Sequence, residues 1–224
     1  MRVVDLSHTI RPGHWRWETR LTHRSTHAQP GAVFQSGVLE TSLHAYTHVD
    51  APVHVLPRGP GLDQMPIDAW IGEATVVDLS DLAVERSGVK AEHLQNRAQH
   101  VRTRDIVLLR TDWDLRADVE TREFWTTGPF TSRDAAEWLV ARGVKAVGYD
   151  YAADEPLRID PEHPERFARE EHTTHDVFFP RDIRVIEYLA NLRAIRADRF
   201  LFIALPLKVL GGDGSPVRAV AIEQ

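Results

Sequence analysis

Four short apolar runs, spaced along the chain, constrain the fold more than any other feature of this sequence. Each is shorter than a typical helix and ends at residues that break the apolar pattern. Continuous apolar runs of this length are typical of strands that other layers cover on both faces. We therefore predict buried strands at residues 74–78 (ATVVD), 106–110 (IVLLR), 146–150 (AVGYD) and 200–205 (FLFIAL).

Two helical patterns lie between these runs. Residues 90–99 form one, and residues 132–142 form the clearer one. Thr131 and Asp134 resemble a capping box at its start, and Gly143 occupies the position of a C-terminal stop. Helices that alternate with buried strands in this way indicate an α/β domain.

Three further segments have weaker patterns. Residues 207–210 and 217–222 bracket the sequence Gly-Gly-Asp-Gly, which predicts a terminal hairpin. Residues 11–30 look irregular. Residues 154–172 are rich in charge and proline, so we expect a surface excursion or lid there.

Bulk properties exclude several classes of protein. A length of 224 residues fits one domain, and we expect residues 1–224 to form it. A net charge of -6 gives no support to a nucleic-acid or anionic-membrane partner. The absence of cysteine excludes disulfides, thiolate metal sites and a cysteine nucleophile. No stretch resembles a signal peptide or a membrane span of roughly 18 apolar residues, so we expect a cytoplasmic protein.

The densest chemical motif is a group of four potential ligands, His44, His48, Asp50 and His54. Because all their spacings are even, an extended chain would place the four side chains on one side. A helical turn would also bring His44 and His48 together, although Pro52 would end it soon afterwards. With 12 histidines in the chain, some clustering arises by chance. Four converging nitrogen and oxygen donors nevertheless favour a Zn²⁺ or Mn²⁺ site with open coordination positions.

This segment resembles a known family motif. LHAYTHVDAPVH, residues 43–54, fills every fixed position of the pattern His-x-x-Thr-His-x-Asp-Ala-Pro-x-His. That pattern is typical of the metal-dependent cyclase superfamily, which includes bacterial kynurenine formamidases and isatin hydrolases. A second similarity is the pair His175 and Glu187, twelve residues apart in a helix-then-strand context. VVDLSHTI, IDAWIGEATVVDLS, VLLRTDW and SRDAAEWLVARGVKAVGYD also resemble family segments, so the resemblance extends across the chain.

The resemblance implies a fold and a site. The fold is a single swivelling β/β/α domain with a mixed sheet or barrel-like β core and flanking helices. One metal ion would be bound by His44, His48, Asp50 and Glu187. A second ion would be bound by Asp50, His175 and Glu187, so that both carboxylates bridge the two ions. His54 would be the catalytic proton-transfer residue.

The resemblance also implies substrate contacts and an assembly. Relatives place a tryptophan from the early part of the chain at the substrate, which makes Trp15 and Trp17 candidates for substrate binding. Ordinary core packing is the alternative for both side chains. The family further implies a homodimer or a higher homo-oligomer.

These residues together predict a reaction class. A divalent ion lowers the pKa of bound water to about 7 and polarises a carbonyl group. The imidazole of His54, with an unperturbed pKa of about 6.5, can accept a proton and deliver it to a leaving group. We therefore predict a metal-dependent hydrolase that cleaves a carbon–nitrogen bond other than a peptide bond. The substrate would be a small molecule, an aromatic amide, lactam or lactone.

Two alternatives remain open at this point. The first is a cyclase or dehydratase of secondary metabolism that uses the same metal to stabilise an enolate. The second is a non-catalytic metal-binding protein, which the presence of His54 disfavours. Relatives often have a small residue, frequently glycine, where Tyr46 stands, and a serine in place of Ala152 in the motif that ends at Asp154. These departures leave the substrate unassigned.

Overall fold

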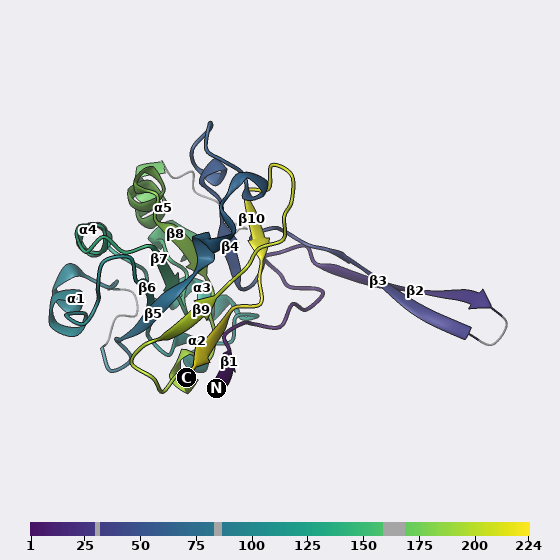
Figure 1. Cartoon of the computed structure of the whole chain (residues 1–224), viewed down its shortest axis with the longest axis horizontal. Helices are drawn as coiled ribbons and strands as arrows, with labels where there is room; N and C mark the ends of the chain where they lie inside the picture. The colour runs from purple at the N-terminus through teal and green to yellow at the C-terminus, as the bar shows by residue number, and fades with distance from the viewer. Residues whose placement is uncertain (30–31, 83–86, 159–168) are drawn as a thin grey trace.

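A mixed nine-stranded sheet forms the centre of the protein in the computed structural model, which describes residues 1–29, 32–82, 87–158 and 169–224. The strand order is β1-β11-β9-β5-β6-β7-β8-β4-β10 (Figure 1). The four central strands, β5 to β8, are parallel, and the strands on both sides of them are antiparallel. The strands are β1 (Arg2–Asp5), β4 (His48–Asp50), β5 (Ile71–Asp78), β6 (Ile106–Arg110), β7 (Ala146–Tyr149), β8 (Arg184–Glu187), β9 (Phe200–Ile203), β10 (Gly214–Pro216) and β11 (Val220–Glu223).

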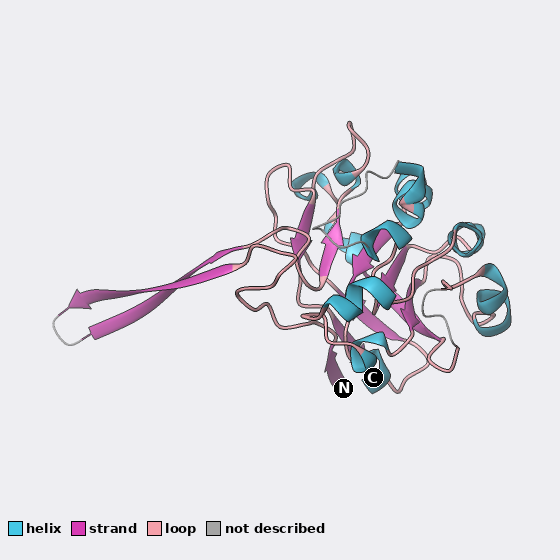
Figure 2. Ribbon diagram, turned by 180° about the vertical axis from the view of Figure 1, so that it is seen from behind, coloured by secondary structure: helices cyan, strands magenta, loops and turns pink. Residues whose placement is uncertain are grey.

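Helices α1, α4 and α5 lie side by side along one face of this sheet (Figure 1). The view from behind shows the same arrangement, with loops and shorter helices around the sheet (Figure 2). Among the described residues, no helix combines the length and apolarity needed to cross a membrane. The α-helices are α1 (Ala91–Arg97), α2 (Trp113–Arg116), α3 (Arg122–Thr127), α4 (Arg133–Ala141) and α5 (Thr173–Phe178).

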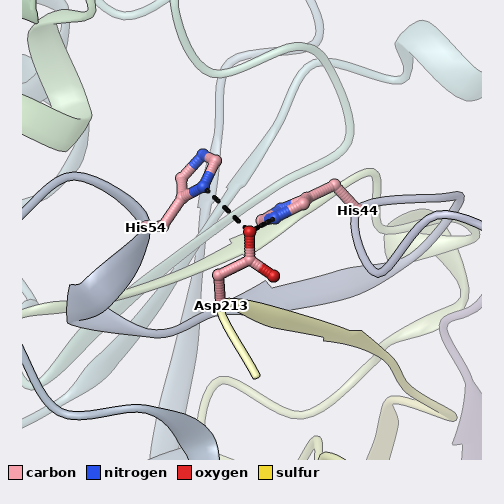
Figure 3. Close-up of side chains that lie close together, drawn as sticks. All are labelled: His44, His54 and Asp213. Carbon is pink, nitrogen blue, oxygen red and sulfur yellow. Dashed lines mark ion pairs between the residues drawn. The ribbon is translucent and has the colours of Figure 1, made fainter. Parts of the chain in front are cut away.

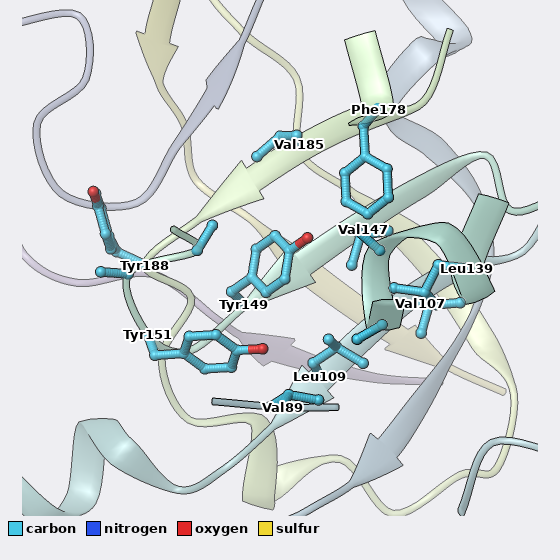
Figure 4. Close-up of a cluster of buried hydrophobic side chains, with 14 of the residues drawn as sticks. Val89, Val107, Leu109, Leu139, Val147, Tyr149, Tyr151, Phe178, Val185 and Tyr188 are labelled. Atoms are coloured by element: carbon cyan, nitrogen blue, oxygen red, sulfur yellow. The ribbon is translucent and has the colours of Figure 1, made fainter. Parts of the chain in front are cut away.

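The predicted strands β6 and β7 are buried on both faces, whereas Leu201 of β9 is exposed and β5 is covered only in part. One set of side chains packs under the helices, and the alternate set packs in a second core on the other side of the sheet. This burial explains the continuous apolar runs of β6 and β7, because a strand covered on both faces can bury apolar side chains at successive positions. Strand β5 begins three residues before the predicted run, whereas β6 matches its run. The first core includes Val107, Leu109, Val147, Tyr149 and Val185 (Figure 4). The second includes Ile106, Leu108, Ala146 and Ile186.

The sheet curls into a barrel-like core. Residues 217–219 join β10, at one end of the strand order, to β11, beside the other end. An extended chain spans at most about 3.6 Å per residue, so these two ends must lie close together. Val217 N donates to Thr47 O, and Leu6 N donates to Ala219 O along this connection. The predicted terminal hairpin is wrong, because β10 pairs with β4 while β11 pairs with β9 and β1.

A two-stranded antiparallel arm projects from the body of the protein (Figures 1 and 2). It consists of β2 (Arg20–Gln29) and β3 (Ala32–Glu40). The prediction that residues 11–30 are irregular is therefore wrong for their second half. The sequence carried a signal for this arm, because a Pro-Gly dipeptide separates the two strands.

The start of α4 differs in detail from its prediction. Ser132 is the N-cap, but its hydroxyl accepts no hydrogen bond from a helix N–H and instead lies within hydrogen-bond reach of Val89 O and Asp134 Oδ1. The hydroxyl of Thr131 instead lies 3.0 Å from that of Tyr151, so the predicted capping box is wrong. Gly143 has a φ of +67°, which confirms the predicted stop. Of the expected excursion at 154–172, residues 159–168 lie outside the described residues, and the lid stays a prediction.

Candidate metal centre

The centre of the site is the pairing of β4 with β8. Strand β4 carries His48 and Asp50 on one face, and its antiparallel register places Glu187 directly opposite His48. Val49 and Ile186 point into the second core, so the three polar side chains emerge on the opposite face. Nε2 of His48 lies 3.1 Å from Oδ1 of Asp50 and 3.4 Å from Oε2 of Glu187. The extended interpretation of the motif is therefore confirmed for the two β4 residues.

Helix α5 brings His175 to the same point. Its Nε2 lies 3.3 Å from Oδ2 of Asp50. Its Nδ1 lies 2.6 Å from Oδ2 of Asp154, a fully buried carboxylate that also accepts a hydrogen bond from Thr174 N. Burial alone would lower the pKa of His175, but the charge and hydrogen bond of Asp154 raise it well above its ordinary value. Asp154 therefore orients His175 from behind.

His44 and His54 flank the centre on its more open side. Nδ1 of His44 lies 2.7 Å from Oδ1 of Asp50, and the rings of His44 and His54 are 4.1 Å apart. His54 belongs to the 3-10 helix η1 (Pro52–His54). Asp213, in the turn before β10, faces both rings: its Oδ2 lies 3.2 Å from His44 Nε2 and 3.8 Å from His54 Nδ1 (Figure 3).

The donor set fits a divalent metal ion. Nε2 of His48 and Oδ2 of Asp50 are buried and have no hydrogen-bond partner, so each lone pair is left for a ligand. Two donors that each lie about 2.1 Å from a tetrahedral ion are about 3.4 Å apart. The separations of 3.1 to 3.4 Å around His48 match this spacing. The described part of the chain contains two donor groups that share Asp50, one with His44 and His48 and one with His54 and His175.

The two carboxylates of the centre also favour a cation. Burial would raise the pKa of Asp50, but the charge of His48 and contacts from His175 and His44 hold it well below its ordinary value. Burial, and then the charge of Asp50, raise the pKa of Glu187. The two groups therefore oppose each other's ionisation, and positive charge between them would relieve the conflict.

The two flanking histidines have opposite pKa shifts. Burial alone would lower the pKa of His44, but Asp50, and then Asp213, raise it to about 9. Burial lowers the pKa of His54 to about 4, against the attraction of Asp50. His54 is therefore uncharged at neutral pH and can accept a proton.

Tyr46 points away from the centre, into the protein. It is fully buried, its φ is +56°, and its hydroxyl donates to Arg11 O and to Glu120 Oε1. Glycine would adopt this left-handed conformation at no steric cost, whereas a tyrosine is strained in it. Its carbonyl accepts a hydrogen bond from Nδ1 of His48 at 2.8 Å, which leaves Nε2 of that ring for the site.

The candidate substrate residues Trp15 and Trp17 belong to an aromatic cluster beside the site. Trp17 is buried, with its ring 4.9 Å from that of Tyr46 and 5.8 Å from that of Tyr188. Tyr188 in turn lies 5.2 Å from the ring of His48. Trp15 is half-buried and stacks on His14 at 5.8 Å. Core packing accounts for Trp17 as it stands, and substrate contact stays a prediction for both tryptophans.

The fold thus brings together all six residues predicted for metal binding and proton transfer: His44, His48, Asp50, His54, His175 and Glu187. Sequence reasoning did not assign a role to the two carboxylates behind the histidines, Asp154 and Asp213. Asp154 stood within a recognised motif, so its position was the available signal. Asp213 was hidden within the glycine-rich turn that predicted a hairpin.

Comparison with known proteins finds one matching family and many similar chains. The family model described as "Putative cyclase" (Cyclase) matches residues 4–156. Kynurenine formamidase from Erythrobacter litoralis is 31% identical over 99% of this chain and 94% of its own length. The enzyme of the same name from Salinibacter ruber is 30% identical over 98% of this chain and 97% of its own. Isatin hydrolase A from Labrenzia aggregata has a TM-score of 0.79 at 24% identity over 100% of this chain and 94% of its own, a likeness in fold.

Proposed function

Since the chain belongs to the cyclase family, we propose that it is a metal-dependent hydrolase that cleaves a carbon–nitrogen bond other than a peptide bond. One observation carries this proposal. His48, Asp50, His175 and Glu187 converge on one point in a buried site, with partnerless donor atoms on His48 and Asp50, while an uncharged His54 stands beside them. A purely structural metal site has no use for that additional histidine.

We assign the roles as follows. His44, His48, Asp50 and Glu187 would hold one divalent ion, and Asp50, His175 and Glu187 would hold a second. When bound, a divalent ion supplies a water nucleophile with a pKa of about 7 and polarises the carbonyl of the substrate. Zn²⁺ and Mn²⁺ are the ions that a set of imidazoles and carboxylates favours.

His54 would carry the proton. It takes a proton from the attacking water as the new carbon–oxygen bond forms. It then delivers that proton to the nitrogen as the carbon–nitrogen bond breaks, so that an amide and water yield a carboxylic acid and an amine. The side chain of His54 lies beside the donor cluster and is 33% exposed. Both the attacking water and the leaving nitrogen can therefore reach it.

The substrate we propose is a small aromatic amide or lactam, such as an aryl formamide. The named activity of the curated relatives and the aromatic residues that adjoin the site support this class. Trp15 or Trp17 would contribute an aromatic surface that contacts the substrate. Trp17 is buried, so its side chain would have to move to make this contact.

We further propose that residues 1–224 act as a single cyclase-like domain and that two copies associate through the arm. An isolated two-stranded hairpin is marginally stable in water, so an arm of this length calls for a partner surface. Apolar side chains on the arm are exposed: Leu21, Phe34, Val38 and Leu39. A cytoplasmic location stays a prediction of the sequence.

The decisive experiment pairs metal analysis with turnover. The purified protein, reconstituted with Zn²⁺ or Mn²⁺, is incubated with an N-formyl aniline, an isatin-like lactam and an aryl lactone. We expect metal-dependent release of the amine or opened ring for at least one of the first two. Bound metal without turnover of any of the three would instead favour cyclase or dehydratase chemistry. A chain that binds no divalent ion would contradict the proposal.

A further inference from the structure

The orientation of the site histidines follows one rule. In His48 and His175, Nε2 faces Asp50, and Nδ1 is held from behind by the Tyr46 carbonyl or by Asp154. An outer partner of this kind selects the tautomer of a ligand histidine and fixes the direction of its ring. His44 is turned the other way: its Nδ1 faces Asp50, and its Nε2 points outwards.

The outward nitrogen of His44 meets Asp213. Oδ2 of Asp213 lies 3.2 Å from Nε2 of His44 and 3.8 Å from Nδ1 of His54 (Figure 3). Both contacts are at ion-pair distance, and the shorter one is to Nε2 of His44, a buried nitrogen that has no hydrogen-bond partner in the structure. Asp213 thus lies behind His44 as Asp154 lies behind His175, but at a longer distance.

The backbone around Asp213 is anchored on both sides. Its carbonyl accepts a hydrogen bond from Ala51 N at 2.8 Å, and Leu62 N donates to Gly212 O at 2.9 Å. Gly214 is paired with Asp50 across β10 and β4. The carboxylate is therefore attached to the strand that carries two of the proposed ligands.

Close packing against the His44 ring depends on the glycine that follows. A Cβ atom at Gly214 would lie 2.7 Å from Cε1 of His44, a distance that side chains do not tolerate. The turn can approach the imidazole only without a side chain at this position. In this Asp-Gly sequence, Asp213 places its carboxylate beside the His44 ring, and Gly214 has no side chain that would clash with the ring.

We propose that Asp213 is a positioning residue that orients His44 as a metal ligand through Nδ1. In the metal-bound chain, the carboxylate would accept the Nε2 proton of His44, which would keep the Nδ1 lone pair directed toward Asp50. The carboxylate of Asp213 also lies near His54, at a distance too long for a hydrogen bond. This inference rests on the metal site of the proposed function but does not depend on the reaction assigned to it.

The test measures Zn²⁺ affinity of the full chain by competition with a chromogenic chelator. Loss of an outer partner typically weakens metal binding by about 10- to 100-fold, and we expect this for Asp213→Ala. Asp213→Asn keeps a neutral acceptor oxygen and should recover part of the loss. Asp68→Ala is the control, because it removes an exposed carboxylate at the opposite end of the parallel strands. This variant should bind Zn²⁺ with the affinity of the wild type.

A spectroscopic measurement reports the geometry directly. In the Zn²⁺-bound wild type, imidazole nitrogen shifts should show His44 protonated at Nε2 and coordinated through Nδ1. Coordination through Nε2, or an Asp213→Ala affinity within twofold of wild type, would overturn the proposal. If the alanine variant does not fold, as judged by thermal unfolding of the metal-free protein, Asp213→Ser decides by the same criterion. A wild type that binds Zn²⁺ but hydrolyses nothing would refute the reaction and leave this inference standing.

Discussion

Glu187 lies directly opposite His48 in the antiparallel register of β4 and β8, with Oε2 3.4 Å from Nε2 of the imidazole. Strand pairing therefore adds Glu187 to the donors that the segment from His44 to His54 supplies. Because the paired backbones are part of one sheet, the relative position of the two side chains is set by the fold and not by a flexible loop.

Replacing Glu187 should weaken metal binding strongly. Both proposed ions use this carboxylate, and outer partners alone are worth about 10- to 100-fold in affinity. We therefore expect Glu187→Ala to lower Zn²⁺ affinity by more than about 100-fold, measured by chelator competition and elemental analysis. The exposed Glu73→Ala serves as the control. Full metal content in Glu187→Ala would remove this residue from the ligand set.

His175 distinguishes one ion from two. If the second ion exists, His175→Ala should lower the metal content from two ions per chain to one, because the other site keeps His44 and His48. Elemental analysis of metal per folded chain is the measurement. A wild type with one ion, unaffected by the substitution, would show that the site is mononuclear and that His175 is not a ligand.

His54 should matter for turnover and not for metal content. General acid–base catalysis contributes about 100- to 10,000-fold, so we expect His54→Ala to lower kcat by that factor while metal per chain stays at the wild-type value. His100→Ala, at a ring bonded to the Val76 carbonyl, is the matched control. Unchanged kcat in His54→Ala would refute the assigned role.

A buried carboxyl away from the donor cluster should give the fold a pH dependence. Asp150 is fully buried and accepts hydrogen bonds from Thr111 N, Thr111 Oγ1 and Asp112 N. Burial, and then the charge of Asp114, raise its pKa to about 8 from the ordinary 3.8. Between these values the folded chain holds a proton that the unfolded chain has lost. This contribution is therefore complete below the unfolded pKa and is lost as the pH rises through about 8.

The measurement is the free energy of unfolding of the metal-free protein against pH. One such group contributes a slope of at most about 1.4 kcal/mol per pH unit. Asp150→Asn cannot ionise, so its curve should fall less steeply than that of the wild type between about pH 4 and pH 8. It also turns one acceptor into a donor, at a cost of about 1–3 kcal/mol. Parallel curves for the two proteins would contradict the raised pKa.

The arm should control self-association. Leu21 and Leu39 are paired across β2 and β3, with exposed fractions of 45% and 49%. A leucine buried at an interface contributes about 1.5–3 kcal/mol, so Leu39→Asp should raise the dimer dissociation constant by more than about tenfold. Sedimentation velocity against concentration measures this, with Leu115→Asp, exposed on the body, as the control. A wild type that stays monomeric would rule out the proposed dimer.

Local patterns in the sequence were enough for the α/β class, the buried strands and the donor cluster. The runs at β6 and β7 are apolar because each residue of a doubly covered strand is buried, and that property is visible without knowing the neighbours. The spacing of two residues between His48 and Asp50 likewise predicts that their side chains lie on the same side of a strand, since alternate residues of a strand share a face. His175 and Glu187 were found through the family resemblance and not through any local pattern.

Only the tertiary structure decided what stands behind the histidines. Asp154 reaches His175 through a buried turn. Asp213 reaches His44 because β10 pairs with β4. Both contacts join residues that are far apart in the sequence. The same cause explains the failed hairpin prediction: Gly214 packs against His44 instead of turning the chain back on itself. Spacing along a chain can indicate which side chains share a face. The partners that complete their hydrogen bonds depend on which strands lie side by side.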